Sequence, residues 1–135
     1  DERRFRPAEP IPAFLDPLLD HAAAFSGIPR GEFAHALVTR YDPGAGIGWH
    51  RDRPQFGKVV GISLAGAAVL RFRKRAEGRF RRAQLELPRR SAYLLSGEVR
   101  EDWEHGIAAH DELRFSITLR TLSRRGAMAA SAPPG

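Results

Sequence analysis

The chain has 135 residues, 42% of them hydrophobic, and no cysteine, which fits one domain with a buried core and excludes disulfide bonds and thiolate metal sites. The net charge of +6 favours a polyanionic partner such as nucleic acid, although an arginine-rich, solvated surface would give the same charge. No apolar run reaches the roughly 20 residues of a membrane-spanning helix, so we expect no membrane partner and a location in the cytoplasm. We also expect a monomer.

The first quarter of the chain predicts an irregular segment followed by one helix. Residues 1–10 are polar and carry two prolines, which is typical of an irregular lead-in. Over about 13–25 the apolar residues recur at helical spacing, and Ser26-Gly27 ends the run. Because the chain begins at Asp1 rather than Met, we expect a fragment of a longer protein.

From residue 34 the hydrophobic period changes to two, which predicts about eight short strands separated by turns. A loop is expected at 97–102, with a short strand near His105 after it, and a disordered tail at 123–135. The other strands are predicted at 35–41, 47–52, 59–64, 67–74, 79–87, 91–96 and 112–122.

Many short strands after a single helix are typical of two packed sheets rather than of alternating strands and helices. The sequence therefore predicts a mainly β fold, a double-stranded β-helix or jelly roll, spanning residues 11–122. The N-terminal helix is expected to pack on the outer face of a sheet.

A short segment, Trp49-His50-Arg51-Asp52, carries two metal-capable side chains. Because side chains alternate along a strand, His50 and Asp52 are expected on one face. An imidazole and a carboxylate are two ligands of the 2-His-1-carboxylate site that binds non-haem iron. The third ligand is open at this point: a jelly roll would bring His105 to the same end, and His110 is the competitor.

The last strand has an unusual polar face. Phe115, Ile117 and Leu119 alternate with four polar residues, which are Arg114, Ser116, Thr118 and Arg120. This face is either solvent-exposed or lines the inside of the jelly roll. Buried guanidinium groups would need an anionic ligand, such as a molecule with two carboxylates.

These segments, taken in order, resemble the AlkB family of Fe(II)/2-oxoglutarate dioxygenases over about residues 34–121. The segments are Arg-Tyr-x-Pro-Gly (40–44), His-x-Asp (50–52), Ile-Ser-Leu (62–64), Ser-Gly-Glu (96–98), Trp-x-His-Gly-Ile (103–107) and Arg-x-Ser-x-Thr-x-Arg (114–120). The stretch 87–91, followed by 96–98, is also similar to eukaryotic members that act on tRNA.

The resemblance implies a complete site. It implies that Fe(II) is held by His50, Asp52 and His105, with 2-oxoglutarate and O2 as cosubstrates. Arg114 would pair with the distal carboxylate of 2-oxoglutarate, helped by the Tyr41 hydroxyl. The remaining cosubstrate contacts that it implies come from Arg120, near the other carboxylate, and from Thr39 and Ser116, where many members have asparagines.

The resemblance also implies oxidative demethylation of alkylated nucleobases in DNA or RNA. Base-repairing members have an acidic residue two positions after the ligand Asp, where this chain has Pro54, so the same iron chemistry on a protein or small molecule stays open. A jelly-roll binding module without turnover is the third possibility. The family also has an N-terminal lid over the nucleotide, of which residues 1–10 would be the last part.

The predicted hairpin of residues 67–87 is strongly basic. Its cations either contact phosphates or keep a solvated strand edge from aggregating. By parity Trp49 lies on the opposite face from His50 and is expected to pack, whereas Trp103 either lines the mouth of the site or joins the core. The basic residues in question are Arg71, Arg73, Lys74, Arg75, Arg79, Arg81 and Arg82, followed by Arg89 and Arg90.

Overall fold

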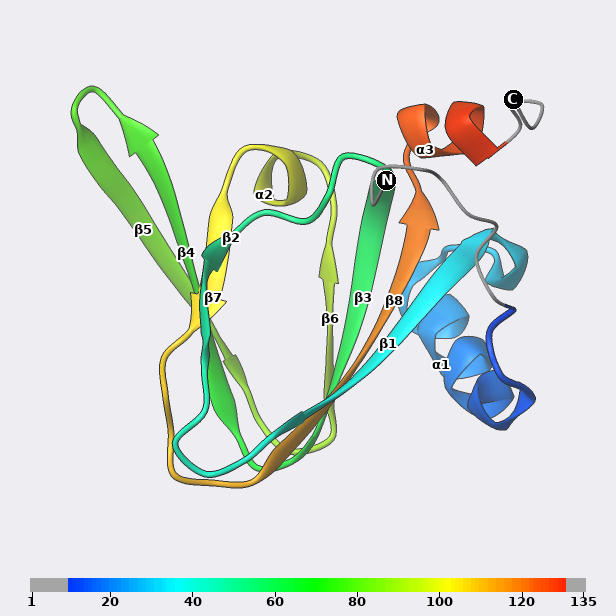
Figure 1. The fold of residues 1–135 in the computed structure, drawn as a ribbon, viewed down its shortest axis with the longest axis horizontal. Helices are drawn as coiled ribbons and strands as arrows, with labels where there is room; N and C mark the ends of the chain where they lie inside the picture. Colours follow the sequence, from blue (N-terminus) through cyan, green and yellow to red (C-terminus); the bar gives the residue numbers. More distant parts are fainter. Residues whose placement is uncertain (1–9, 131–135) are drawn as a thin grey trace, which may run out of the picture.

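The computed structural model describes residues 10–130, which form two facing antiparallel sheets with a helix on one outer face (Figure 1). Each sheet has four strands, in the orders β1-β8-β3-β6 and β2-β7-β4-β5. The chain passes repeatedly between the two sheets, which confirms the jelly roll that the sequence predicts. The strands are β1 (Phe33–Tyr41), β2 (Ile47–His50), β3 (Phe56–Ala65), β4 (Ala68–Ala76), β5 (Arg79–Leu87), β6 (Ser91–Leu95), β7 (Glu104–Ile107) and β8 (Arg114–Leu122).

The helix α1 (Asp16–Ser26) follows a short 3-10 turn, η1 (Ala13–Leu15), and covers the outer face of the β1-β8-β3-β6 sheet, as predicted (Figure 1). It ends at Gly27, whose φ of 76° is the left-handed conformation that glycine adopts readily. The residues buried between helix and sheet are Leu19, Ala22, Ile28, Phe33, Val60, Ile117 and Leu119.

A second apolar cluster lies between the two sheets. Strand β8 contributes to both layers, because Ile117 and Leu119 face the helix while Arg114 and Arg120 face the interior between the sheets. The polar face of this strand therefore lines the inside of the jelly roll, which decides between the two alternatives left by the sequence. The buried members of the second cluster are Val59, Ala68, Leu70, Phe72, Leu87, Tyr93, Leu95 and Ile107.

Three local predictions are wrong. Strand β2 ends at His50, so Asp52 lies in the loop between β2 and β3 rather than on the strand. The expected loop at 97–102 contains the short helix α2 (Glu98–Glu101). The expected disordered tail contains α3 (Arg124–Ala130), while residues 1–9 and 131–135, which include most of the lead-in and the end of the tail, lie outside the described residues.

One more short 3-10 turn, η2 (Arg30–Glu32), leads into β1. Within residues 10–130, no helix combines the length and the apolar character that crossing a membrane requires.

Candidate metal centre and active-site cavity

The three predicted metal ligands meet at one end of the space between the sheets. One ligand atom from each of His50, Asp52 and His105 lies within 4.8 Å of the others. Antiparallel pairing of β2 with β7 places His50 directly opposite His105, with ring centroids 4.4 Å apart. Although Asp52 has left the strand, the loop still directs its carboxylate to the two imidazoles. A facial set of two imidazoles and one carboxylate suits a divalent transition metal, above all Fe(II).

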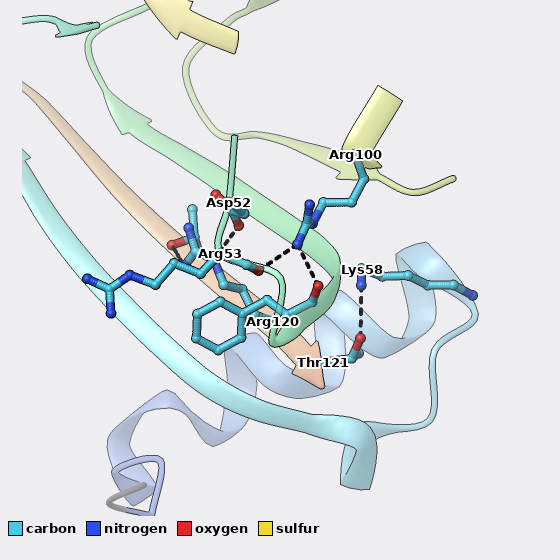
Figure 2. Close-up of polar contacts among 8 residues, drawn as sticks. Asp52, Arg53, Lys58, Arg100, Arg120 and Thr121 are labelled. Atoms are coloured by element: carbon cyan, nitrogen blue, oxygen red, sulfur yellow. Dashed lines mark hydrogen bonds and ion pairs between the residues drawn. The ribbon is translucent and has the colours of Figure 1, made fainter. Parts of the chain in front are cut away.

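Hydrogen bonds around these ligands fix their orientation. His50 Nδ1 lies 2.9 Å from the carbonyl oxygen of Gly48, so the proton sits on Nδ1 and the lone pair of Nε2 is free for a metal. Asp52 Oδ2 accepts a hydrogen bond of 2.6 Å from Arg120 Nε (Figure 2), and Arg120 also donates to Thr118. Both partners of the ion pair are largely buried, with side chains 11% and 6% exposed.

The electrostatics keep Asp52 and His105 in their metal-binding protonation states. Burial opposes ionisation of Asp52, but the hydrogen bond and the charge of Arg120 outweigh it and hold the pKa of this carboxyl below its ordinary value. Burial, aided by the charge of His50, lowers the pKa of His105 to about 4. Near neutral pH, His105 is therefore a neutral imidazole and Asp52 a carboxylate, which are the forms that bind metal.

The ligands open into a cavity of about 330 Å³ between the two sheets, a size suited to a small molecule. At its other side lies Arg114, which is 1% exposed. Arg114 Nε donates to Ser63 Oγ at 2.9 Å, and its guanidinium carbon lies 5.2 Å from the centre of the Tyr41 ring. Among the described residues, Nη1 and Nη2 of Arg114 have no hydrogen-bond partner although both are buried.

All eight predicted site residues line this cavity, and Thr39 and Ser116 are direct neighbours across the β1–β8 pair. Their predicted roles toward the cosubstrate stay predictions. The structure adds a contact that the sequence did not predict, because Arg120 donates a hydrogen bond to Asp52. The residues brought together are His50, Asp52, His105, Arg114, Arg120, Tyr41, Thr39 and Ser116.

The other histidines do not join the centre. His110, the competing ligand, lines a separate cavity of about 400 Å³ beside the start of β4 and the end of β5. His35 packs against the Phe56 ring at 4.8 Å, and burial lowers its pKa. His21 is exposed on α1. Within the described part of the chain, His105 and not His110 lies with His50 and Asp52, which supports the prediction of His105 as the third ligand.

A model of the 2OG-Fe(II) oxygenase superfamily, in which 2OG is 2-oxoglutarate, matches residues 2–120. The chain belongs to this superfamily. Members of the superfamily use Fe(II), 2-oxoglutarate and O2, and the centre described above offers the ligand set for the metal.

This 2OG-Fe(II) oxygenase is similar to curated relatives that include AlkB-like proteins. It is 28% identical to the Alkylated DNA repair protein ALKBH8 homolog of Arabidopsis thaliana, covering 85% of this chain and 40% of the relative. It is 39% identical over 72 residues to mouse tRNA (carboxymethyluridine(34)-5-O)-methyltransferase ALKBH8, covering 52% of this chain and 10% of the relative. Uncharacterized protein L905 of Acanthamoeba polyphaga mimivirus is 28% identical, and the match covers 83% of this chain and 59% of the relative. The chain thus spans less than two thirds of each relative.

The described residues of this 2OG-Fe(II) oxygenase also fit the cosubstrate. A guanidinium with two unpaired, buried NH2 groups is unfavourable by about 1–3 kcal/mol for each unsatisfied group. A carboxylate pairs with both groups at once in a bidentate arrangement. Because Arg114 faces the same cavity as the metal ligands, a small dicarboxylate fits between them.

Two residues that shape the oxygenase cavity have no role in the sequence-based prediction, although Ser63 belongs to the Ile-Ser-Leu segment. Ser63 is fully buried and orients Arg114, and its signal was a lone hydroxyl in the apolar run of β3. Tyr93 lines the cavity from β6, and burial raises its pKa. Gly61 makes room for Tyr93, because a Cβ at this position would overlap the ring. A glycine in a strand interior is a signal for such a close approach.

The two tryptophans lie outside the cavity. Trp49 stacks on Arg73 on the outer face of its sheet, 4.5 Å from ring centre to guanidinium carbon, as expected for a packing residue. Trp103 packs against the cluster between the sheets and donates from Nε1 to Glu98, so it has the core role rather than a place at the mouth of the site.

A larger hollow of about 1050 Å³ begins on the outer side of Asp52 and includes Pro54. Arg100, from α2, reaches into this region and donates to the carbonyl oxygens of Arg53 and Phe56 (Figure 2). The buried guanidinium thereby fixes the loop between β2 and β3, which carries Asp52. The hollow provides space for a substrate beside the metal centre.

Proposed function

We propose that this chain is the catalytic domain of a 2-oxoglutarate-dependent dioxygenase that demethylates alkylated nucleobases in DNA or RNA. The observation that carries the chemistry is the unpaired, buried guanidinium of Arg114 in the same cavity as a His-Asp-His metal site. The nucleic-acid target is supported by the names of the Arabidopsis and mouse relatives and by the net charge of +6. A cytoplasmic location and a monomeric state stay predictions from the sequence.

Fe(II) would be held by His50, Asp52 and His105. With 2-oxoglutarate and O2 bound, the metal supplies oxidative decarboxylation of 2-oxoglutarate to succinate and CO2, coupled to hydroxylation of a substrate C–H bond. When the hydroxylated carbon is an N-methyl group, it leaves as formaldehyde and the base is demethylated.

The residues of the chain bind and orient the reactants. Arg114 pairs with the distal carboxylate of 2-oxoglutarate, and the Tyr41 ring over the guanidinium holds it in place. Arg120 keeps Asp52 ionised and correctly directed. The apolar walls of the cavity exclude water, which strengthens these charge interactions. The apolar wall residues are Leu37, Ile47, Val59, Leu70, Leu95 and Ile107.

A second candidate keeps the iron chemistry but changes the target. Pro54 lines the hollow beside Asp52, at the position where base-repairing relatives have an acidic residue that contacts the base. The side chain of proline offers no hydrogen bond to a base, and proline has no backbone N–H. This observation favours a protein or small-molecule substrate.

Succinate formation from 2-oxoglutarate by the whole protein, supplied with Fe(II), separates these functions. We expect turnover that methylated DNA or RNA oligonucleotides stimulate and their unmethylated counterparts do not. The matched variant His50→Ala should lose iron and turnover together. Turnover that no methylated oligonucleotide stimulates would reject the nucleobase target and leave the second candidate. Absence of both iron binding and turnover would leave only a binding module.

A further inference from the structure

The end of the β4–β5 hairpin projects beyond its sheet. Strand β7 pairs with β4 only over Leu70–Arg73, whereas the pairing of β4 with β5 continues to Ala76 and Arg79. Residues 74–81 therefore pair only with each other, Arg82 pairs with Arg73, and Figure 1 shows the end of the hairpin standing clear of the other strands. We call residues 74–82 the hairpin tip.

The hairpin is cationic and largely unneutralised. Residues 71–82 contain seven basic side chains and a single acidic one, Glu77. Two of the cations have ion-pair partners, since Arg73 pairs with Glu104 at 3.0 Å and Lys74 lies 3.9 Å from Glu98. Among the described residues, no ion pair involves the remaining basic side chains, which are all exposed: Arg71, Arg75, Arg79, Arg81 and Arg82.

Aromatic rings hold several of these guanidinium groups in place. Arg73 lies between Trp49 and Phe80, at 4.5 and 4.6 Å from the two ring centres. Arg75 and Arg82 lie 4.9 and 5.7 Å from the centre of Phe80. A guanidinium stacked by its face still offers its N–H edge, and the stacking reduces the side-chain entropy lost when an anion binds.

Two surface hollows share Arg51, one of them beside Asp52 and the other beside the hairpin tip. The hollow of about 1050 Å³ beside Asp52 includes Arg51, and Arg51 also lines a neighbouring hollow of about 440 Å³. The other residues of the smaller hollow are Arg73, Lys74, Arg75, Asp102 and Glu104. A chain molecule with one unit at the metal centre can therefore continue past Arg51 to the hairpin tip.

We propose that the hairpin tip, together with Arg51, is a phosphate-binding arm for the polynucleotide strand that flanks the reacting nucleotide. The proposal rests on the proposed function, because it assumes that the site takes a nucleotide. Phosphate contacts of this kind supply affinity and register without base specificity.

Protection of an edge strand is the competing explanation, because β5 lies at the edge of its sheet. Beyond Arg73 strand β4 pairs only with β5, so charges on both strands would provide that protection. Edge protection does not account for the aromatic rings that hold the guanidiniums, or for Arg51, which lines both hollows.

The test is binding of the whole protein, in the presence of 2-oxoglutarate and Mn(II), to a labelled methylated single-stranded oligonucleotide over a range of salt concentrations. The variant Arg75→Gln/Arg79→Gln/Arg82→Gln removes three cations from the arm. Each phosphate contact contributes roughly 0.7 to the slope of log affinity against log salt, so the slope should fall by about 2. At about 0.1 M salt, affinity should fall by up to about 100-fold.

A matched variant removes the same charge elsewhere. Arg40→Gln/Arg89→Gln/Arg90→Gln changes an exposed position on β1 and the turn at the opposite end of the hairpin, and it should keep the wild-type slope (Figure 1). An equal loss of slope in both variants would mean that only net charge matters, and would overturn the arm. Thermal unfolding of both variants shows whether each is folded.

The two proposals fail in distinguishable ways. If methylated oligonucleotides stimulate succinate formation by the wild type, and the hairpin variant shows the same oligonucleotide KM and the same salt slope, the arm is wrong and the proposed function stands. If no oligonucleotide binds or stimulates the wild type, the nucleobase function itself is wrong and the arm is rejected with it.

Discussion

Replacing Arg114 by methionine should keep the stability of the free protein and lower its affinity for 2-oxoglutarate. The substitution removes two buried NH2 groups that have no partner within the described residues, each unfavourable by about 1–3 kcal/mol. It also removes the hydrogen bond to Ser63, which is worth about 1 kcal/mol. The free Arg114→Met protein should therefore be at least as stable as the wild type.

The affinity should change in the opposite direction. A carboxylate of 2-oxoglutarate left without its buried partner loses about 3–5 kcal/mol, which raises Kd from roughly 100-fold to several thousand-fold. In the wild type, 2-oxoglutarate at about 100 times Kd should stabilise the fold by ~2.7 kcal/mol, or about 10 °C in Tm. In Arg114→Met the same concentration should raise Tm by less than about 2 °C.

The assay is thermal unfolding with Mn(II), with and without 2-oxoglutarate, and Arg40→Met, an exposed arginine of β1, is the control that should keep the full shift. Two results would refute the reasoning. One is a full ligand shift in Arg114→Met, which would mean that another group binds the cosubstrate. The other is a free variant several kcal/mol less stable than the wild type, which would mean that Arg114 is a structural residue.

Two further substitutions test the surroundings of the cavity. Arg120→Met leaves the buried carboxylate of Asp52 unpaired, so urea unfolding of the metal-free protein should show a loss of about 3–5 kcal/mol; a loss under about 1 kcal/mol would contradict the ion pair. Gly61→Ala forces a methyl group into the Tyr93 ring and should lower the free energy of unfolding by about 1–3 kcal/mol, whereas Gly31→Ala, with open space around it, should change little; equal effects would count against the close approach.

Much of the fold is predictable from the sequence, because the spacing of apolar residues along a strand or helix indicates which side chains are buried. The alternation of Arg114, Ser116, Thr118 and Arg120 with apolar residues marks a strand between two environments, and β8 indeed lies between the helix-covered face and the cavity. Periodicity cannot say which environment each face meets. That depends on the partner strands, which are distant in sequence.

The errors occur where tertiary contacts determine local structure. The tail helix α3 follows Ser123, whose hydroxyl donates to the Pro54 carbonyl and accepts from the backbone N–H of Gly126. A Cβ at Gly126 would overlap the Gln55 carbonyl, so the helix lies directly against this loop. The alanine-rich composition of the tail contains no sign of that contact. Likewise, α2 is a single short turn whose Arg100 is buried through bonds to another loop.

The sequence predicts which residues form the candidate site more completely than it predicts what each of them contacts. The ligands His50, Asp52 and His105 are identified by the order of motifs, and the structure brings them together. The bond from Arg120 to Asp52 depends on where the loop after β2 places the carboxylate, which the pattern of residues does not encode. The hydrogen bond between Ser63 and Arg114 was not predicted, because it forms only when β3 lies beside β8.

The central claim is that this chain couples 2-oxoglutarate decarboxylation to removal of an N-methyl group from a nucleobase. The most direct measurement counts formaldehyde against succinate when the whole protein, supplied with Fe(II), acts on a methylated oligonucleotide in air. The account predicts equal amounts of the two products, both lost in His105→Ala. Succinate without formaldehyde would contradict the demethylation, and a protein that binds iron yet forms neither product would contradict the claim as a whole.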